Sequence, residues 1–179
     1  MKQTLVLLAL LALLTGCQTY TFDKAQPRDS AAMPAFPDIL QGAYAHRSGP
    51  ELMEISDNAI IISSVAQQDS FTLKATERDT VFTISDTAVL KTYKGYYFIS
   101  RFVRDRWMVF SIKPENNTIV LGKITDSSDI ARLKQLAPYH CDSTGCVFRP
   151  SQKQFIKYIK GDGFRDRDTF DRVIVPNAL

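Results

Sequence analysis

Two cysteines in the C-terminal third, Cys141 and Cys146, are the residues best suited to chemistry, because they enclose a turn-forming tetrapeptide at residues 142–145. A disulfide between them would close a short loop and stabilise the fold modestly. A redox-active pair is an alternative, although the spacing is not Cys-x-x-Cys. A metal site that adds His140 to the two thiolates is another alternative, and it lacks a fourth ligand nearby.

Other candidates for catalysis are sparse. His46 and His140 are the only histidines, and they lie far apart in the chain. The sequence contains no Gly-x-Ser-x-Gly nucleophile motif and no glycine-rich phosphate loop. Asp166 and Asp168 alternate with arginines, which indicates mutual neutralisation on a surface. We therefore expect a protein that is not an enzyme and that uses no cofactor and no metal.

The first seventeen residues carry the most specific motif of the chain. Lys2 gives a positive start, and residues 5–14 form an apolar run that is too short for a membrane span of about 20 residues. The run ends at Leu14-Thr15-Gly16-Cys17, which resembles the lipobox of bacterial lipoproteins. The resemblance implies a lipoprotein signal peptide over residues 1–16 and a mature Cys17 that carries three fatty acyl chains, palmitate among them. An ordinary cleaved signal peptide and an uncleaved anchor are the alternatives.

Acylation of Cys17 would hold the protein on a membrane through its lipid anchor without spanning the bilayer, because several acyl chains make desorption negligible. In lipoproteins of enterobacterial type, an Asp after the cysteine favours the inner membrane, and Gln18 occupies that position here. The resemblance therefore implies the cell outer membrane, with the domain facing the periplasm. That compartment is oxidising, so we expect Cys141 and Cys146 to form a structural disulfide.

The mature chain has the length of one domain, since removal of residues 1–16 leaves 179 − 16 = 163 residues. Residues 17–37 hold three prolines among polar residues, which predicts a lipidated flexible tether. The alternative is that Tyr20 and Phe22 begin an edge strand packed on the domain. Residues 38–179 would form a single β-rich domain. The formal charge of +3 gives no reason to expect a nucleic acid partner.

Residues 40–125 have the pattern of antiparallel β-structure, with short runs rich in Ile, Val, Phe, Tyr and Thr between turn residues. The expected strands cover residues 41–47, 51–55, 59–65, 71–75, 80–84, 89–93, 96–103, 106–112 and 118–125. Alternation leaves both faces of residues 96–112 largely apolar, so a second layer must cover the sheet.

Two helices in the C-terminal third are expected to form this cover. One follows the cap residues 126–128, and the other follows the capping box Ser151-x-x-Gln154. A short helix or a final strand would occupy residues 164–175. The fold class is therefore α+β and mainly β: a curved antiparallel sheet or small barrel of about eight strands, covered by two or three C-terminal helices. The segment Leu40-Gln41-Gly42-x-Tyr44 is similar to the start of lipocalin-like barrels.

Two basic clusters are candidates for binding anionic lipid head groups or an acidic partner, although a solvated face is the simpler interpretation of both. They are Lys153, Lys157 and Lys160 at helical spacing, and Arg101, Arg104 and Arg106 in one hairpin. The many aromatic residues between positions 93 and 110 indicate a core, or the lining of a cavity inside a barrel.

Two functions follow from this sequence. The first is a non-enzymatic lipoprotein anchored in the outer membrane, whose periplasmic β-rich domain binds a protein partner or contributes to cell-envelope assembly. The second is a lipocalin-like carrier or sensor of a small apolar ligand. An internal cavity would favour the carrier, and a solid core with an exposed apolar patch of several hundred Å² would favour the partner-binding protein.

Overall fold

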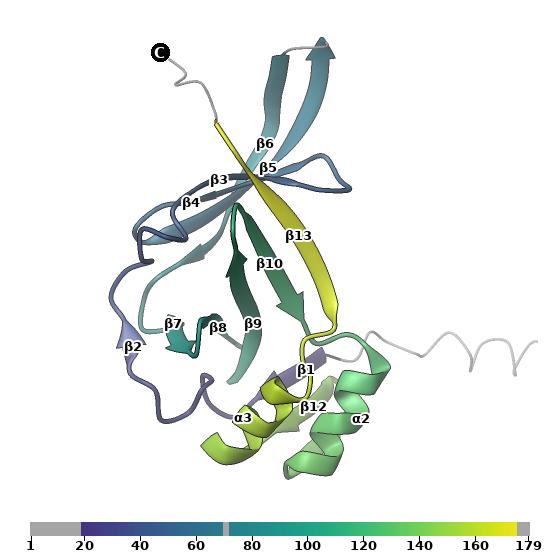
Figure 1. Cartoon of the computed structure of the whole chain (residues 1–179). Coiled ribbons are helices and arrows are strands. Elements are labelled where there is room, and N and C mark those ends of the chain that lie inside the picture. The colour runs from purple at the N-terminus through teal and green to yellow at the C-terminus, as the bar shows by residue number, and fades with distance from the viewer. Residues whose placement is uncertain (1–18, 70–71, 175–179) are drawn as a thin grey trace, which may run out of the picture.

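The computed structural model describes residues 19–69 and 72–174, which form one curled, mainly antiparallel sheet and two helices (Figure 1). The helices are α2 (Ser127–Leu136) and α3 (Gln152–Lys160). The strands are β1 (Thr19–Phe22), β2 (Ala32–Met33), β3 (Gly42–His46), β4 (Glu51–Ile55), β5 (Ala59–Asp69), β6 (Thr72–Thr83), β7 (Ala88–Tyr93), β8 (Tyr96–Val103), β9 (Arg106–Glu115), β10 (Thr118–Lys123), β11 (Tyr139–Asp142), β12 (Gly145–Phe148) and β13 (Asp166–Val173).

The centre of the fold is a half-barrel in which neighbouring strands run in the order β7-β8-β9-β10-β13-β3-β4-β5-β6. Every pairing along this path is antiparallel. Within the described residues, β6 and β7 do not pair, so the sheet curls without closing there. The predicted mainly β fold and curved antiparallel sheet are confirmed, and so are the two helices in the C-terminal third.

The sheet has thirteen strands in the described part of the chain, not the expected eight or so. The additional strands are β1 and β2 in the expected tether and β11 and β12 around the cysteines, while β13 is the final strand that was one of two alternatives for residues 164–175. In addition, the two strands expected over residues 71–75 and 80–84 are one strand, β6. Its polar middle continues the pairing with β5, since Arg78 lies opposite Ser63 and Glu77 opposite Ser64.

The two faces of β8 and β9 belong to two different cores, as their doubly apolar pattern predicts. Ile99 and Ile112 face the concave side of the half-barrel, where they pack with Leu90, Met53 and residues from β3, β5 and β13. The opposite face, which includes Phe98 and Val109, packs against the helices, β1 and β12. The buried residues that these elements add to the second core include Phe22, Phe148, Phe155 and Tyr158. Both cores depend on the same two strands, because successive side chains of a strand point to opposite faces.

Both predicted helix starts are confirmed. The Asp126 side chain caps α2 by accepting hydrogen bonds from the backbone N–H groups of Ser128 and Asp129. The Ser151 hydroxyl accepts from the Gln154 N–H, and the Gln154 side chain accepts from the Ser151 N–H, which completes the capping box of α3. These caps satisfy backbone donors that a helix leaves without intrahelical partners.

The predicted flexible tether over residues 17–37 is wrong for residues 19–37. β1 pairs in parallel with β12 from Thr19 to Phe22, and Phe22 also pairs with Trp107 of β9. Phe22 and Phe36 are buried in the two cores. The alternative of a packed strand beginning at Tyr20 and Phe22 is therefore the better description, although β1 lies between two strands and not at an edge. The burial of two phenylalanines outweighs the effect of the local prolines, because each buries a large apolar side chain.

Candidate ligand pocket

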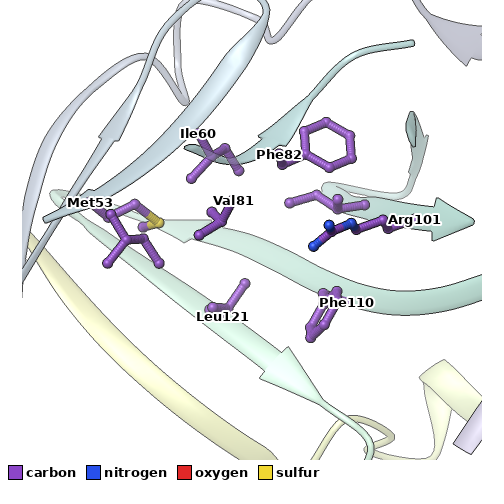
Figure 2. A pocket seen from close by; sticks show the side chains of 9 residues that line it. Met53, Ile60, Val81, Phe82, Arg101, Phe110 and Leu121 are labelled. Atoms are coloured by element: carbon purple, nitrogen blue, oxygen red, sulfur yellow. The ribbon is translucent and has the colours of Figure 1, made fainter. Parts of the chain in front are cut away.

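An apolar pocket of about 200 Å³ lies on the concave face of the half-barrel (Figure 2). It is lined by Met53, Ile60, Ile62, Val81, Phe82, Ile99, Arg101, Phe110 and Leu121. These side chains come from β4, β5, β6, β8, β9 and β10, so the pocket exists only because the sheet curls. We refer to these nine residues as the apolar pocket.

A β-bulge explains how two neighbouring residues of β6, Val81 and Phe82, both line the apolar pocket. Ile60 pairs with Phe82, but Ile61 pairs with Thr80, so Val81 is the extra residue of the bulge. A bulge re-aims side chains relative to strict alternation. Val81 and Phe82 consequently both contribute apolar surface where a regular strand would turn one of them away.

The size and lining of the apolar pocket suit a small apolar group. A cavity of roughly 150 Å³ lined by aliphatic and aromatic side chains stays dry and binds benzene. Sites for drug-sized ligands have volumes of about 300–1,000 Å³. At about 200 Å³ the apolar pocket falls between these values, which fits a short alkyl chain or a single ring.

Among the described residues that line the apolar pocket, Arg101 is the only charged one. Its side chain extends from β8 toward the other lining side chains (Figure 2). It is exposed, and it makes no hydrogen bond or ion pair with another residue in the described ranges. A guanidinium group with free donors therefore stands at the edge of an apolar cavity.

A second, polar recess of about 590 Å³ lies beside the first strand and the β8–β9 turn. It is lined by Thr19, Thr21, Val103, Arg104, Arg106, Met108 and Thr144, and we call these residues the polar recess. Met108 pairs with Arg101 across β9 and β8, so the two concavities adjoin along this pair of strands.

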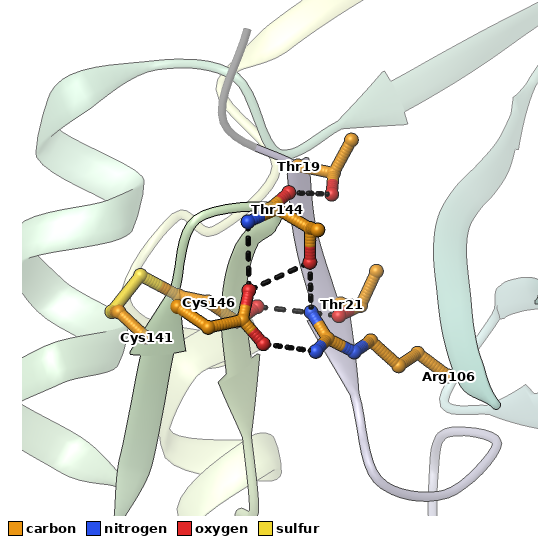
Figure 3. Close-up of a disulfide and its surroundings, with 7 residues drawn as sticks. Thr19, Thr21, Arg106, Cys141, Thr144 and Cys146 are labelled. Atoms are coloured by element: carbon orange, nitrogen blue, oxygen red, sulfur yellow. Dashed lines mark hydrogen bonds and ion pairs between the residues drawn. A yellow bond between two sulfur atoms is a disulfide. The ribbon is translucent and has the colours of Figure 1, made fainter. Parts of the chain in front are cut away.

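The Arg106 side chain forms hydrogen bonds with the loop between the two cysteines (Figure 3). Its Nη1 donates to the Thr144 hydroxyl at 3.0 Å, and its Nη2 donates to an Asp142 carboxylate oxygen. The Arg106 guanidinium and the Thr144 hydroxyl hold the pKa of Asp142 well below its usual range. Arg104, in contrast, makes no such bond with any residue that the structure describes. Of the predicted arginine cluster, Arg101 and Arg104 are therefore available to a ligand and Arg106 is engaged.

The predicted disulfide between Cys141 and Cys146 is confirmed, with an S–S distance of 1.99 Å. It joins paired residues of β11 and β12 (Figure 3), and β12 in turn pairs with β1. Within residues 19–69 and 72–174, no group of three or more His, Cys, Asp or Glu side chains is arranged to hold a metal ion. Cys17, the predicted lipid attachment residue, lies outside the described residues.

Of the remaining sequence candidates, half-buried His46 lies beside the acidic pair Asp166 and Asp168, whereas His140 and the α3 lysines lie apart from them on the surface. His140 is exposed on β11. The His46 ring lies between Glu51 and Asp168, with N–O distances of 3.3 and 3.7 Å. Lys123 forms ion pairs with both members of the acidic pair, because its Nζ lies 3.9 Å from a carboxylate oxygen of Asp166 and 3.1 Å from one of Asp168. The α3 lysines Lys153, Lys157 and Lys160 are all exposed, as their helical spacing predicts.

Sequence reasoning did not identify the lining of the apolar pocket, because the residues come from six strands and only the curl brings them together. The one signal was Arg101 itself, a charged residue at a position that alternation places on the same face as Ile99 and Tyr97. No protein-family model matches the chain, and no curated protein and no solved structure matches it. None of the helices in the described residues is long and apolar enough to cross a membrane.

Proposed function

We propose that the protein is a lipid-anchored binding protein of the outer membrane that holds a small apolar ligand in the apolar pocket. The observation that carries this proposal is a pocket of about 200 Å³ that, among the described residues, is lined by eight apolar side chains and one arginine. An internal cavity lined by aromatic residues was the feature expected to favour a carrier over a protein with a solid core. The apolar pocket supports the carrier hypothesis as a concavity of the sheet, lined by aliphatic side chains and two phenylalanines.

The anchor is proposed from the sequence, where Leu14-Thr15-Gly16-Cys17 resembles a lipobox. Only Gln18 separates Cys17 from Thr19, the first residue of β1. An acylated Cys17 would therefore hold the domain close to the lipid surface, with the polar recess near the membrane, because Thr19 lines that recess. Arg104 would then lie where a basic side chain gains about 1 kcal/mol from an anionic lipid surface.

The other sequence-based hypothesis, a domain that binds a protein partner, receives less support. The large exposed apolar side chains of the described residues are Ile39, Phe102, Tyr139 and Ile174, which come from four separate segments. Partner docking is expected to use a contiguous apolar patch of several hundred Å².

The test follows the methionine methyl groups, which report on both concavities. Removal of the leader leaves Met33, Met53 and Met108. Met53 lines the apolar pocket and Met108 lines the polar recess, while Met33 lines neither. The processed, acylated chain, labelled at the methionine methyls and placed in phosphatidylcholine nanodiscs, would be titrated with 1-decanol. We expect a saturable NMR shift of the Met53 methyl and an unchanged Met33 methyl.

A matched pair of variants on β5 provides the control. Ile62→Phe adds volume inside the apolar pocket, whereas Ile61→Phe makes the same change at a neighbouring residue that does not line it. Decanol should shift Met53 in the Ile61→Phe variant and fail to do so in Ile62→Phe. Equal responses in the two variants, or no saturable response in the unmodified chain, would count against the proposed function.

A further inference from the structure

Arg101 has hydrogen-bonding capacity that the protein does not use. A guanidinium group carries five N–H donors in a planar fork. Arg101 directs none of them to another residue in the described part of the chain. Several exposed arginines are paired: Arg47 with Asp171, Arg78 with Glu54, and Arg167 with Asp162. The side chains of Arg104 and Arg149 are exposed and unpaired among the described residues as well, but of these unpaired arginines Arg101 is the one that lines the apolar pocket.

The position of Arg101 relates this free capacity to the apolar pocket. On β8, Ile99 precedes Arg101 by two residues, so both side chains lie on the concave face and both line the pocket. Across the strands, Ile99 pairs with Phe110 and Arg101 pairs with Met108. Along this face the lining therefore changes from apolar side chains to a cation within two residues.

Beyond Arg101 the same face carries basic and hydroxyl side chains among apolar ones such as Val103 and Met108. Met108, the cross-strand partner of Arg101, belongs to the polar recess, together with Arg104 and three threonines. The order along the face is thus apolar pocket, Arg101, polar recess. A molecule with an apolar tail and a charged head matches this arrangement, because its tail fits the apolar pocket and its head can reach Arg101 and the polar recess. A wholly apolar ligand would leave Arg101 and the polar recess without a partner.

We propose that the ligand of the apolar pocket is a single-chain anionic amphiphile, whose tail occupies the pocket and whose anionic group pairs with Arg101. This inference rests on the proposed function and narrows it to one ligand class. The fork of an arginine matches the two oxygens of a carboxylate or phosphate, which makes paired hydrogen bonds stronger than a single neutral one. A fatty acid carboxylate and the phosphate of a lysophospholipid share this chemistry.

The test compares three ten-carbon probes with the same tail at pH 7: decanoate, decyl phosphate and 1-decanol. Each is titrated into the acylated chain in phosphatidylcholine nanodiscs, and binding is followed at the Met53 and Met108 methyls. The variants are Arg101→Gln, which removes the cation at the pocket, and Arg104→Gln, which removes an equal charge outside it. Native mass spectrometry of the same samples gives the stoichiometry, and Arg101→Lys is a second variant that retains the charge.

We expect decanoate or decyl phosphate to bind the unmodified chain about ten-fold or more tightly than the Arg101→Gln variant, because one charge-assisted pair is lost. Decanol should bind both with equal affinity, and Arg104→Gln should weaken the anionic probes by less than Arg101→Gln does. The tighter of the two anionic probes identifies the source, carboxylate or phosphate.

The outcomes separate this inference from the proposed function. If decanol binds and Arg101→Gln leaves the anionic probes unaffected, the apolar pocket is functional and the anionic class is wrong. If Arg101→Gln and Arg104→Gln weaken binding equally, the attraction is a long-range effect of charge and the pairing with Arg101 is overturned. If none of the three probes gives a saturable shift, the proposed function itself fails.

Discussion

Gly145 lies against the backbone of Thr19 where the parallel strands β1 and β12 begin, and a β-carbon at position 145 would overlap the Thr19 carbonyl group. Gly145 also has a φ of +141°, which side chains other than glycine rarely adopt. The pairing of β1 with β12, which holds the start of the described chain on the domain, therefore requires glycine at position 145.

Replacement of Gly145 by Ala should lower the free energy of unfolding by about 3 kcal/mol, through backbone strain and overlap together. The matched control is Gly95→Ala in the β7–β8 turn, where φ is +80° but no atom lies within 4 Å of the added carbon. That control should cost only about 1 kcal/mol. Urea denaturation of both variants is the measurement, and equal costs would mean that the contact with Thr19 contributes nothing.

Removal of the disulfide through Cys141→Ala and Cys146→Ala should cost about 2 kcal/mol, the loop-entropy value for so short a loop. The bond closes one hairpin, so the half-barrel should persist and the Met53 methyl should keep its chemical shift. Met108 should move, because its recess includes Thr144 of the same hairpin. Loss of all dispersed methyl signals on removal of the bond would show that the disulfide holds more than its own hairpin.

Asp129 is fully buried on α2, and its carboxylate accepts a hydrogen bond of 2.6 Å from the Arg165 N–H. Burial raises the pKa of Asp129 above its usual value, against the effect of that hydrogen bond. The folded state therefore favours the protonated form of Asp129. Protonated Asp129 contributes its full share of the folding stability below about pH 4, and this share is lost as the pH rises through the raised pKa. Compared with the unmodified chain, Asp129→Asn should thus gain stability as the pH rises above about 4.

A control of opposite sign lies one turn away at Asp126. Its hydrogen bonds with Ser128 lower the pKa of the Asp126 carboxyl, so the stabilisation appears above the unfolded pKa and is lost as the pH falls. Asp126→Asn should therefore lose stability relative to the unmodified chain as the pH rises. Thermal denaturation between pH 3 and 8 would distinguish the two variants, and parallel curves for both would contradict the assignment.

Lys91 holds the segment between β1 and β2 in place. Its ammonium group donates to the carbonyl oxygens of Pro27 and Arg28, at 3.0 and 3.2 Å, and burial lowers the pKa of Lys91. Lys91→Met should speed amide hydrogen exchange in residues 23–31, because these carbonyls lose their donor, at a cost of about 1 kcal/mol. Lys94→Met in the neighbouring turn is the control, and equal exchange in both variants would refute this role.

Cys17→Ser should move the protein from the membrane fraction to the soluble fraction, since the proposed anchor requires the thiol. The domain should stay folded, because Phe22 and Phe36 hold the N-terminal segment in the two cores. Cell fractionation and mass analysis of the mature N-terminus are the measurements. Retention on the membrane, or a mature terminus without fatty acid, would remove the basis for the anchor.

Local patterns determined much of this fold in advance. The caps at Asp126 and Ser151 and the turn at Lys94 and Gly95 depend on residues close together in the chain, so the sequence predicts them directly. The doubly apolar pattern of β8 and β9 likewise required a second layer, which the helices provide. The pairing of Cys141 with Cys146 is a contact within one hairpin and was predictable for the same reason.

Only the tertiary structure decided the rest, because it depends on contacts between distant residues. The pattern of residues 19–37 predicts a tether, because it does not show that β1 pairs with β12 or that Phe22 and Phe36 are buried in the two cores. The apolar pocket likewise needs six strands, a bulge at Val81 and the curl of the sheet. The sequence could place Arg101 on an apolar face, but the arrangement of the other strands determined that this face encloses a cavity. Periodicity specifies which side chains share a face, and long-range packing specifies what that face encounters.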